Sequence, residues 1–124
     1  MSKYKYFSEK EMACKCCGVY KMDDGFMKQL DYLRQECGFP FKVTSAYRCP
    51  KHNQATSNTG PTGPHTTGKA VDISVRGEQA MILIQKAVEA GFTGIGVSQK
   101  GTGRFIHLDT LTSPAYPRPN LWSY

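Results

Sequence analysis

Apolar residues recur along this chain at helical spacing in some stretches and at alternate positions in others. Over residues 23–37, apolar side chains form a helical stripe after two aspartates, and Gly38 ends the pattern, which predicts a helix with one buried face. Residues 78–90 predict a second, strongly apolar helix, which the following glycine closes. A short first helix is expected after Ser8, because Ser8 and Glu11 have the spacing of a capping box.

Period-two alternation predicts the strands of a sheet. The four stretches are residues 39–44, 70–75, 94–98 and 104–110. In the second, alternation directs the valine and isoleucine side chains to the core and Asp72 to the opposite face. In the fourth, two apolar side chains take the core face, while His107 and Asp109 share the other face.

Residues 45–68 show neither period and predict a long irregular loop. Such a loop inside a compact domain is uncommon and usually functional. Near its end, Pro61, Pro64 and several glycines restrict the chain just before His65 and let the backbone turn closely into the next strand. A loop stiffened in front of one histidine points to a ligand role for that residue.

Length and composition fit one domain that spans residues 1–124. The chain is 40% hydrophobic and 21% charged, which excludes a disordered or fibrous protein. The proline-rich tail, residues 113–124, is expected to wrap the surface with Leu121 and Trp122 as anchors. No apolar run approaches the roughly 18 residues of a membrane span. The first residues lack the apolar centre of a signal peptide, so we expect synthesis in the cytoplasm and delivery by another route.

The formal net charge is +6, which favours anionic partners such as nucleic acid or an anionic cell wall. The basic residues are scattered, however, and form neither a basic run interleaved with aromatics nor a zinc-finger pattern. We therefore expect no nucleic-acid partner. We also expect a monomer that does not bind membranes.

The chain has five cysteines, an odd number that cannot pair completely within one chain. Without a signal peptide, reduced thiols are expected. The C-x-x-C spacing of Cys14 and Cys17 could contribute to a structural zinc site with Cys37 or Cys49. The alternative, small buried hydrophobic residues, is favoured because the second pair is not closely spaced.

His65, Asp72 and His107 form a three-ligand set for a metal. Alternation places the aspartate and the second histidine on the polar faces of two strands, and His65 enters from the adjoining loop. Two imidazoles and one carboxylate leave the fourth position of a tetrahedral zinc open, as in catalytic sites. Taken singly, each residue also fits a structural role: an exposed loop histidine, an aspartate paired with lysine, or a satisfied core histidine.

Several motifs resemble those of the zinc D-Ala-D-Ala carboxypeptidases and their hedgehog-like relatives. HTTGKAVDI, at residues 65–73, resembles the signature H-x-x-G-x-A-x-D-[IL]; SAYRCPKHN, at residues 45–53, resembles the segment S-x-x-R-x-x-x-x-N. FIHLD, at residues 105–109, resembles the strand that supplies the last histidine, and the ending at residues 117–124 is similar to the cell-wall hydrolase branch, which includes phage proteins. The resemblance runs from about residue 7 to 124. It implies an α+β fold in which helices flank a small antiparallel sheet that carries a zinc site.

The resemblance also implies roles for single residues. His65, Asp72 and His107 would be ligands of a Zn²⁺ cofactor. Arg48 would face the substrate and stabilise a carboxylate or a developing oxyanion, a task for which a guanidinium fork is suited.

The resemblance also implies a supporting role for two polar residues of the loop, and the chain departs from the family pattern at one position. Ser45 and Asn53 would brace the loop through hydrogen bonds to its backbone. Many relatives carry a carboxylate general base three residues before the last histidine, where this chain has Arg104, which cannot accept a proton. Asp109 is the nearby carboxylate, and it is expected to be either the base or a partner that orients His107.

Two classes of function follow. The first is a zinc metallopeptidase, of carboxypeptidase or endopeptidase type, that acts on peptidoglycan peptides after release from the cell or as part of a phage particle. The second is a non-catalytic zinc-binding module of the same fold that binds the cell wall or a protein. The sequence leaves the scissile bond open among D-Ala-D-Ala, L-Ala-D-Glu and cross-bridge bonds.

Overall fold

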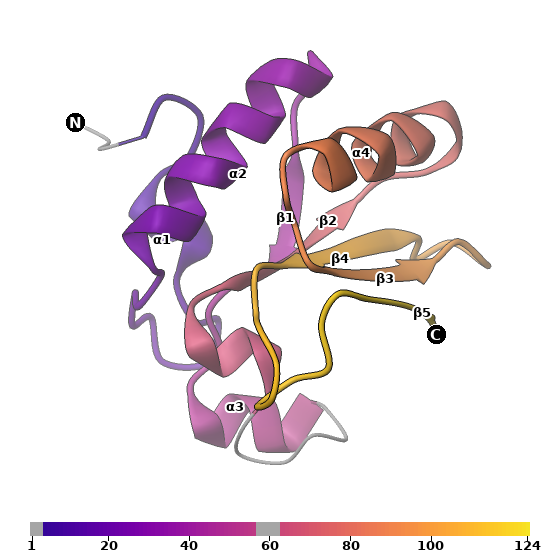
Figure 1. Ribbon diagram of the computed structural model, residues 1–124. Helices are drawn as coiled ribbons and strands as arrows, with labels where there is room; N and C mark the ends of the chain where they lie inside the picture. Colours follow the sequence, from indigo (N-terminus) through magenta and orange to yellow (C-terminus); the bar gives the residue numbers. More distant parts are fainter. Residues whose placement is uncertain (1–3, 57–62) are drawn as a thin grey trace.

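Helices lie on both sides of a five-stranded sheet in the computed structural model, which describes residues 4–56 and 63–124 (Figure 1). The helices are α1 (Glu9–Met12), α2 (Asp24–Cys37), α3 (Pro50–Thr56), the 3-10 helix η1 (Pro64–Thr67) and α4 (Gly77–Glu89). The strands are β1 (Lys42–Ser45), β2 (Ala70–Ser74), β3 (Gly94–Ser98), β4 (Phe105–Asp109) and β5 (Asn120–Ser123). The combination confirms the expected small α+β architecture.

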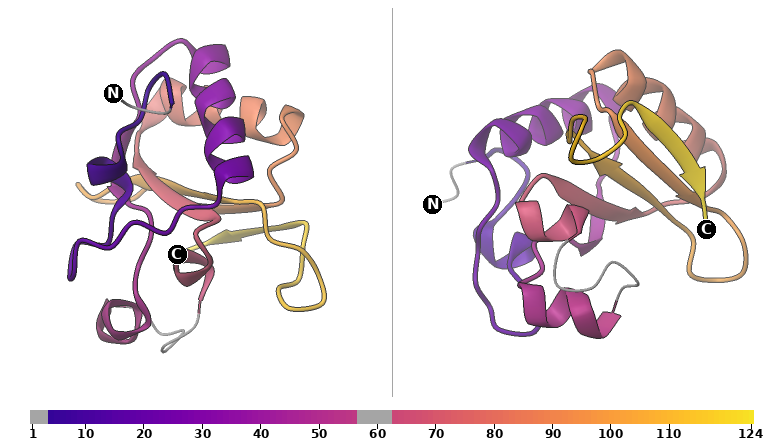
Figure 2. Two further views of the ribbon diagram at one scale, coloured as in Figure 1. Left: turned by 90° about the vertical axis from the view of Figure 1, so that its left-hand side faces the viewer. Right: turned by 60° about the horizontal axis from the view of Figure 1, so that its bottom comes forward.

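The sheet has the order β1-β2-β4-β3-β5. Its first four strands pair antiparallel, as expected, but β5 pairs parallel with β3, so the sheet is mixed and the expectation of a purely antiparallel sheet is wrong. The reason lies in the path of the chain. Strand β4 ends opposite Gly94, the first residue of β3, and the chain re-enters the sheet at that same end, where Asn120 also pairs with Gly94. Strand β5 therefore runs in the direction of β3 along its outer edge (Figure 2).

The two long helices cover one face of the sheet and form the core with it. Figure 1 shows α2 and α4 above the sheet and α3 below it, and the turned views in Figure 2 keep this separation. Asp23 caps α2 by accepting a 2.8 Å hydrogen bond from the backbone of Phe26, and Gly38 ends the helix in the left-handed conformation. The fully buried residues of this layer include Leu30, Leu33, Val71, Ile73, Leu83, Ile106 and Leu108. The opposite face of the sheet is left to the polar side chains of the strands.

The segment at residues 45–68 is more regular than predicted. It contains α3, where Pro50 occupies the first helical position that proline favours, and η1, which starts at Pro64. The prediction for Pro61 lies outside the described residues. Gly68 ends η1 at φ +76°, and a side chain there would meet the Lys21 carbonyl oxygen at 2.1 Å, so glycine is required at this turn.

The tail differs from its predicted role as an anchored wrap. It forms the edge strand β5, in which Leu121 is 67% exposed, so Leu121 is not an anchor. Leu121 pairs with Ile95 at the outer edge of the sheet, beyond the cover of the helices. Trp122 alternates to the other face, where its ring lies 5.1 Å from that of His107. No helix among the described residues has the length and apolarity needed to cross a membrane.

Candidate metal centre

His65, Asp72 and His107 meet on the face of the sheet that α2 and α4 leave free. Asp72 and His107 lie directly opposite each other on the antiparallel strands β2 and β4, and η1 brings His65 against them. The Asp72 Oδ1 atom is 3.0 Å from His107 Nδ1 and 3.2 Å from His65 Nε2. All three residues are buried, and their potential ligand atoms lie within 4.8 Å of one another. The predicted ligand set is therefore brought together in one cluster that could hold a metal ion.

The outer nitrogen of each imidazole fixes the tautomer of the ring. His65 Nδ1 lies 2.8 Å from the carbonyl oxygen of Ala46, and His107 Nε2 lies 2.7 Å from Asp109 Oδ2. Both partners are acceptors, so in each neutral ring these nitrogens carry the hydrogen. The remaining nitrogens then present lone pairs to the Asp72 carboxylate. Three acceptors that converge in this way need a cation among them, either a proton on an imidazole or a metal ion, and their chemistry fits a divalent metal such as zinc.

The charges of this cluster shift the pKa values of its members. Burial alone would raise the pKa of Asp72, but hydrogen bonds with His107 and His65 outweigh it and hold that pKa well below its ordinary value. Burial alone would lower the pKa of His107, but its bonds with Asp109 and Asp72 raise it. The site thus concentrates negative charge around two imidazoles, as a cation site requires.

The guanidinium of Arg48 lies beside the same carboxylate. Its Nη2 atom is 3.7 Å from Asp72 Oδ2, its Nε donates to Ser45 Oγ at 3.0 Å, and its Nη1 donates to Asn53 Oδ1 at 3.4 Å. Ser45 and Asn53 therefore hold the Arg48 side chain directly, while their expected hydrogen bonds to the loop backbone stay a prediction. The Arg48 backbone N–H also donates to the His65 carbonyl at 3.1 Å, which ties the arginine to the ligand-bearing turn.

Asp109 lies behind His107 and is fully buried. Its Oδ2 accepts from His107 Nε2 at 2.7 Å and from Arg118 Nη2 at 2.8 Å, while its Oδ1 accepts from Arg118 Nε at 2.9 Å and from the Leu111 backbone at 3.3 Å. Burial would raise the pKa of Asp109, but the bonds from Arg118 and His107 lower it to about 2. The carboxylate contacts the ring nitrogen that faces away from Asp72. This geometry favours an orienting role over that of a base, although both roles stay predictions.

Arg118 and Trp122 join the site from the tail, and sequence reasoning predicted a role there for neither residue. The Arg118 guanidinium carbon lies 5.0 Å from the centre of the Trp122 ring, which in turn packs on His107. The indole of Trp122 can lie this close to the sheet because residue 96 is a glycine: a side chain there would meet the indole nitrogen at 2.5 Å. In the sequence, Arg118 stands out only by its place between two prolines of the tail that resembles the family. No local pattern connects it with Asp109.

The position that many relatives use for a general base lies outside this network. Arg104 donates its Nε to the Gly101 carbonyl at 3.0 Å and has no acceptor to offer. The carboxylates of the described cluster are those of Asp72 and Asp109, both already engaged by imidazoles. The family pattern and this chain thus differ at the proton-transfer step.

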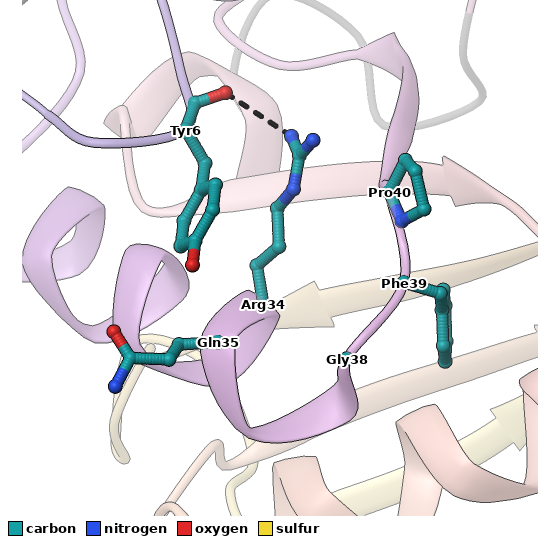
Figure 3. Close-up of a pocket in the computed structure, with 6 residues that line it drawn as sticks. All are labelled: Tyr6, Arg34, Gln35, Gly38, Phe39 and Pro40. Carbon is teal, nitrogen blue, oxygen red and sulfur yellow. Dashed lines mark hydrogen bonds between the residues drawn. The ribbon is translucent and has the colours of Figure 1, made fainter.

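A separate hollow of about 270 Å³ lies at the C-terminal end of α2. Figure 3 shows its lining and the 3.1 Å hydrogen bond from Arg34 to the Tyr6 carbonyl. The lining consists of Tyr6, Arg34, Gln35, Gly38, Phe39 and Pro40. These six residues offer no carboxylate, imidazole or thiol, so this hollow lacks the ligand set of a metal site.

Comparison with known families agrees with this site. The sequence model of the peptidase M15 family matches residues 5–109, a span that holds His65, Asp72, His107, Arg48 and Asp109. No curated protein matches the chain. Because the match covers most of the sequence and includes the metal centre, the chain belongs to the peptidase M15 family, whose members are typically zinc-dependent.

Proposed function

We propose that this protein is a zinc metallopeptidase that hydrolyses peptide bonds of peptidoglycan. Membership of the peptidase M15 family implies a peptidase. The observation that carries the proposal is the pair of imidazoles whose outer nitrogens are fixed by acceptors, so that both inner nitrogens face Asp72. This is the donor set of a catalytic zinc with three protein ligands.

The residues around the ligands have separate tasks in this proposal. A zinc ion held by His65, Asp72 and His107 would supply a Lewis acid that activates water and polarises the scissile carbonyl. Arg48, held by two side-chain oxygens and only 17% exposed, presents a fixed fork to a substrate carboxylate or to the negative charge that develops on the carbonyl oxygen. Asp109 keeps the His107 hydrogen on Nε2 and so keeps Nδ1 free as a ligand.

The substrate class follows from charge and from the motifs. A net charge of +6 without a concentrated basic run suits attraction to an anionic wall better than a specific nucleic-acid contact. A fork such as Arg48 can bind the terminal carboxylate of a D-Ala-D-Ala peptide, which suits a carboxypeptidase, or the carbonyl of an internal bond, which suits an endopeptidase. We place the protein among the cell-wall hydrolases, in the endolysin-like branch, with a role after release or within a phage particle.

A second candidate is a non-catalytic zinc-binding module. The observation in its favour is Arg104 in the place of the general base, together with the full engagement of Asp109 by His107 and Arg118. Such a module would bind wall fragments but release no products. The two candidates therefore differ in one measurable property, turnover.

The test is digestion of purified peptidoglycan with and without a chelator, with the products identified by mass spectrometry. Zinc-dependent release of D-Ala is expected for a carboxypeptidase, and release of internal peptide fragments for an endopeptidase. His107→Ala should abolish release. A preparation that binds zinc and wall fragments but releases nothing would contradict the peptidase and support the module.

Arg48→Lys provides a finer test, because lysine keeps the charge but loses the planar fork. We expect kcat/KM to fall at least about tenfold, which is roughly 1.4 kcal/mol of transition-state stabilisation, with unchanged zinc content. Arg34→Lys is the matched control, since Arg34 bonds to the Tyr6 carbonyl in the separate hollow. Equal turnover in both variants would remove Arg48 from the active site.

A further inference from the structure

Three cysteine thiols form a second cluster that the peptidase site does not use. Cys14 and Cys17 come from the turn after α1, and Cys49 comes from the segment before α3. Their sulfur atoms lie within 4.8 Å of one another, and all are free thiols. In a tetrahedral zinc site with Zn–S bonds of about 2.3 Å, the sulfurs are about 3.8 Å apart, so small side-chain shifts would bring these three onto one ion.

The backbone around Cys14 and Cys17 forms a tight hydrogen-bonded turn. The Cys14 N–H donates to the Val19 carbonyl at 2.8 Å, and the Gly18 N–H donates to the Cys14 carbonyl at 2.8 Å. Gly18, directly after Cys17, has φ +74°, a conformation that glycine adopts without strain. The chain therefore folds back between the two cysteines and directs both sulfurs to one side, where Cys49 lies.

Backbone N–H groups further prepare the sulfur of Cys14 as a thiolate. The Cys49 N–H donates to it at 3.3 Å. The Cys49 sulfur likewise accepts from the His52 backbone at 3.4 Å. These contacts stabilise negative sulfur atoms at a point where several thiols crowd together.

A fourth thiol, that of Cys16, precedes Cys17 directly in the sequence and interacts with the Cys49 thiol. Cys16 is exposed and lies outside the group of three sulfurs, so its side chain would have to turn toward that group to join an ion. Cys37, by contrast, lies at the end of α2 and is not part of the cluster.

We propose that Cys14, Cys17 and Cys49 bind a structural zinc ion, with Cys16 as the fourth ligand. A closed set of four thiolates leaves no position for substrate and is typical of structural zinc. Zinc displaces the protons of the thiols when it binds, so the step needs no oxidant or reductant. The sequence-based preference for the cysteines as small buried hydrophobic residues holds for Cys14 but is wrong for the others, since Cys16 and Cys17 are exposed and Cys37 and Cys49 are only partly buried. The proposal puts a second metal centre in its place, and this centre does not depend on the proposed peptidase function.

This second centre would fasten the N-terminal segment to the segment that carries Arg48. Cys49 follows Arg48 directly in sequence. The Tyr47 N–H donates to the Met12 carbonyl at 3.3 Å, so the two segments already touch on the other side of Arg48. A metal shared by Cys14 and Cys49 would make that junction rigid, and the direction of the Arg48 guanidinium would depend on it.

The experiment measures zinc per chain by elemental analysis in protein purified under reducing conditions. We expect about two zinc ions in the wild type and about one in Cys14→Ser, Cys17→Ser or Cys49→Ser. The matched control Cys37→Ser should keep about two. Wild-type zinc content in the three cluster variants would overturn the proposal, and unchanged zinc affinity in Cys16→Ser would overturn the choice of fourth ligand.

The double variant His65→Ala/His107→Ala separates this proposal from the peptidase site. It should lose all peptidoglycan hydrolysis yet retain about one zinc ion that a thiol-specific mercurial reagent releases. Complete loss of zinc in that variant would overturn the thiolate centre alone, whereas full retention of two zinc ions would contradict the peptidase site alone.

Two measurements on the wild type keep the proposal testable if the cysteine variants do not fold. Cobalt substitution should give intense thiolate-to-metal charge-transfer absorption in the near ultraviolet, and its absence would overturn the proposal. Alkylation under denaturing conditions should label all five cysteines. A chain that is two hydrogens lighter and resists labelling at two cluster cysteines would show a disulfide instead and would also overturn it.

Discussion

The substitution Asp109→Asn tests whether the candidate metal centre depends on the carboxylate that lies behind His107. The change keeps the size of the side chain but replaces one accepting oxygen by an amide donor. Four donor contacts converge on the two oxygens of Asp109: one from His107, two from Arg118 and one from the Leu111 backbone. An asparagine cannot accept from all of them in either orientation.

Each orientation of the amide has a definite cost. If its oxygen faces His107, its NH₂ group meets Arg118 Nε and the Leu111 N–H, and a guanidinium that is only 6% exposed loses its counter-charge. If its NH₂ faces His107, the ring must accept at Nε2 and carry its hydrogen on Nδ1, which removes the lone pair that faces Asp72. Leaving a buried charge unpaired costs about 3–5 kcal/mol, and loss of an orienting partner lowers metal affinity about 10- to 100-fold.

We expect a loss of stability near the lower end of this range, because the Arg118 guanidinium keeps other contacts. Its Nη1 donates to the Pro117 carbonyl at 2.8 Å, and its guanidinium lies over the Trp122 ring. The predicted outcome is a loss of about 3 kcal/mol in the free energy of unfolding and a fall in zinc affinity of at least about tenfold. Urea unfolding of the chelated protein measures the first, and competition with a zinc chelator measures the second.

Asp31→Asn is the matched control for this substitution. Asp31 also accepts backbone hydrogen bonds, from Tyr6 at 2.9 Å and from Lys5 at 3.2 Å, but it belongs to α2, on the other side of the sheet. Its zinc affinity should equal that of the wild type. Recovery of hydrolysis by Asp109→Asn in excess zinc indicates the orienting role, whereas a zinc-loaded but inactive variant indicates a general base. Wild-type affinity and rate together would refute both roles.

Two further predictions concern packing around the sheet. Gly96→Ala should displace the indole of Trp122, because the new methyl carbon would lie 2.5 Å from the indole nitrogen. We expect the fluorescence of this single tryptophan to change and the free energy of unfolding to fall by about 1–3 kcal/mol. The control Gly103→Ala, whose new carbon meets nothing within 4 Å, should change neither quantity. Leu83→Ala should lower the free energy of unfolding, measured in urea, by about 2–5 kcal/mol, because Leu83 is fully buried. Met81 lies on the same helix but is 73% exposed, so Met81→Ala should change it by no more than about 0.5 kcal/mol. Equal effects would contradict this assignment of the buried face.

Local pattern was sufficient for the parts of the fold that local rules control. Alternation along β2 and β4 correctly assigned Asp72 and His107 to the face that α2 and α4 leave free, and the pairing of the two strands placed them opposite each other. The capping box at Ser8 and the glycine stop at Gly38 also match the structure. These features depend on residues a few positions apart, which the sequence shows directly.

The features that local pattern missed all depend on contacts between distant segments. The parallel pairing of β5 follows from where the chain re-enters the sheet, which no local period encodes. The link from Arg118 to Asp109 and the convergence of Cys14 with Cys49 join residues that only the folded chain brings together. The sequence shows no second closely spaced cysteine pair, which argued against a zinc site. In the folded chain the third sulfur of the cluster comes instead from a single remote residue, Cys49.

Arg48 connects the two clusters, and this explains why its position is so fully determined. On one side its backbone binds the His65 carbonyl, and its guanidinium lies against Asp72. On the other side, the next residue is Cys49, whose N–H donates to the Cys14 sulfur. In the proposed mechanism this fork meets a substrate group at a fixed distance from the metal, and it would gain from support on both sides, since a displacement of about 1 Å can cost about 100-fold in rate. Disruption of either cluster should therefore weaken catalysis through the same guanidinium.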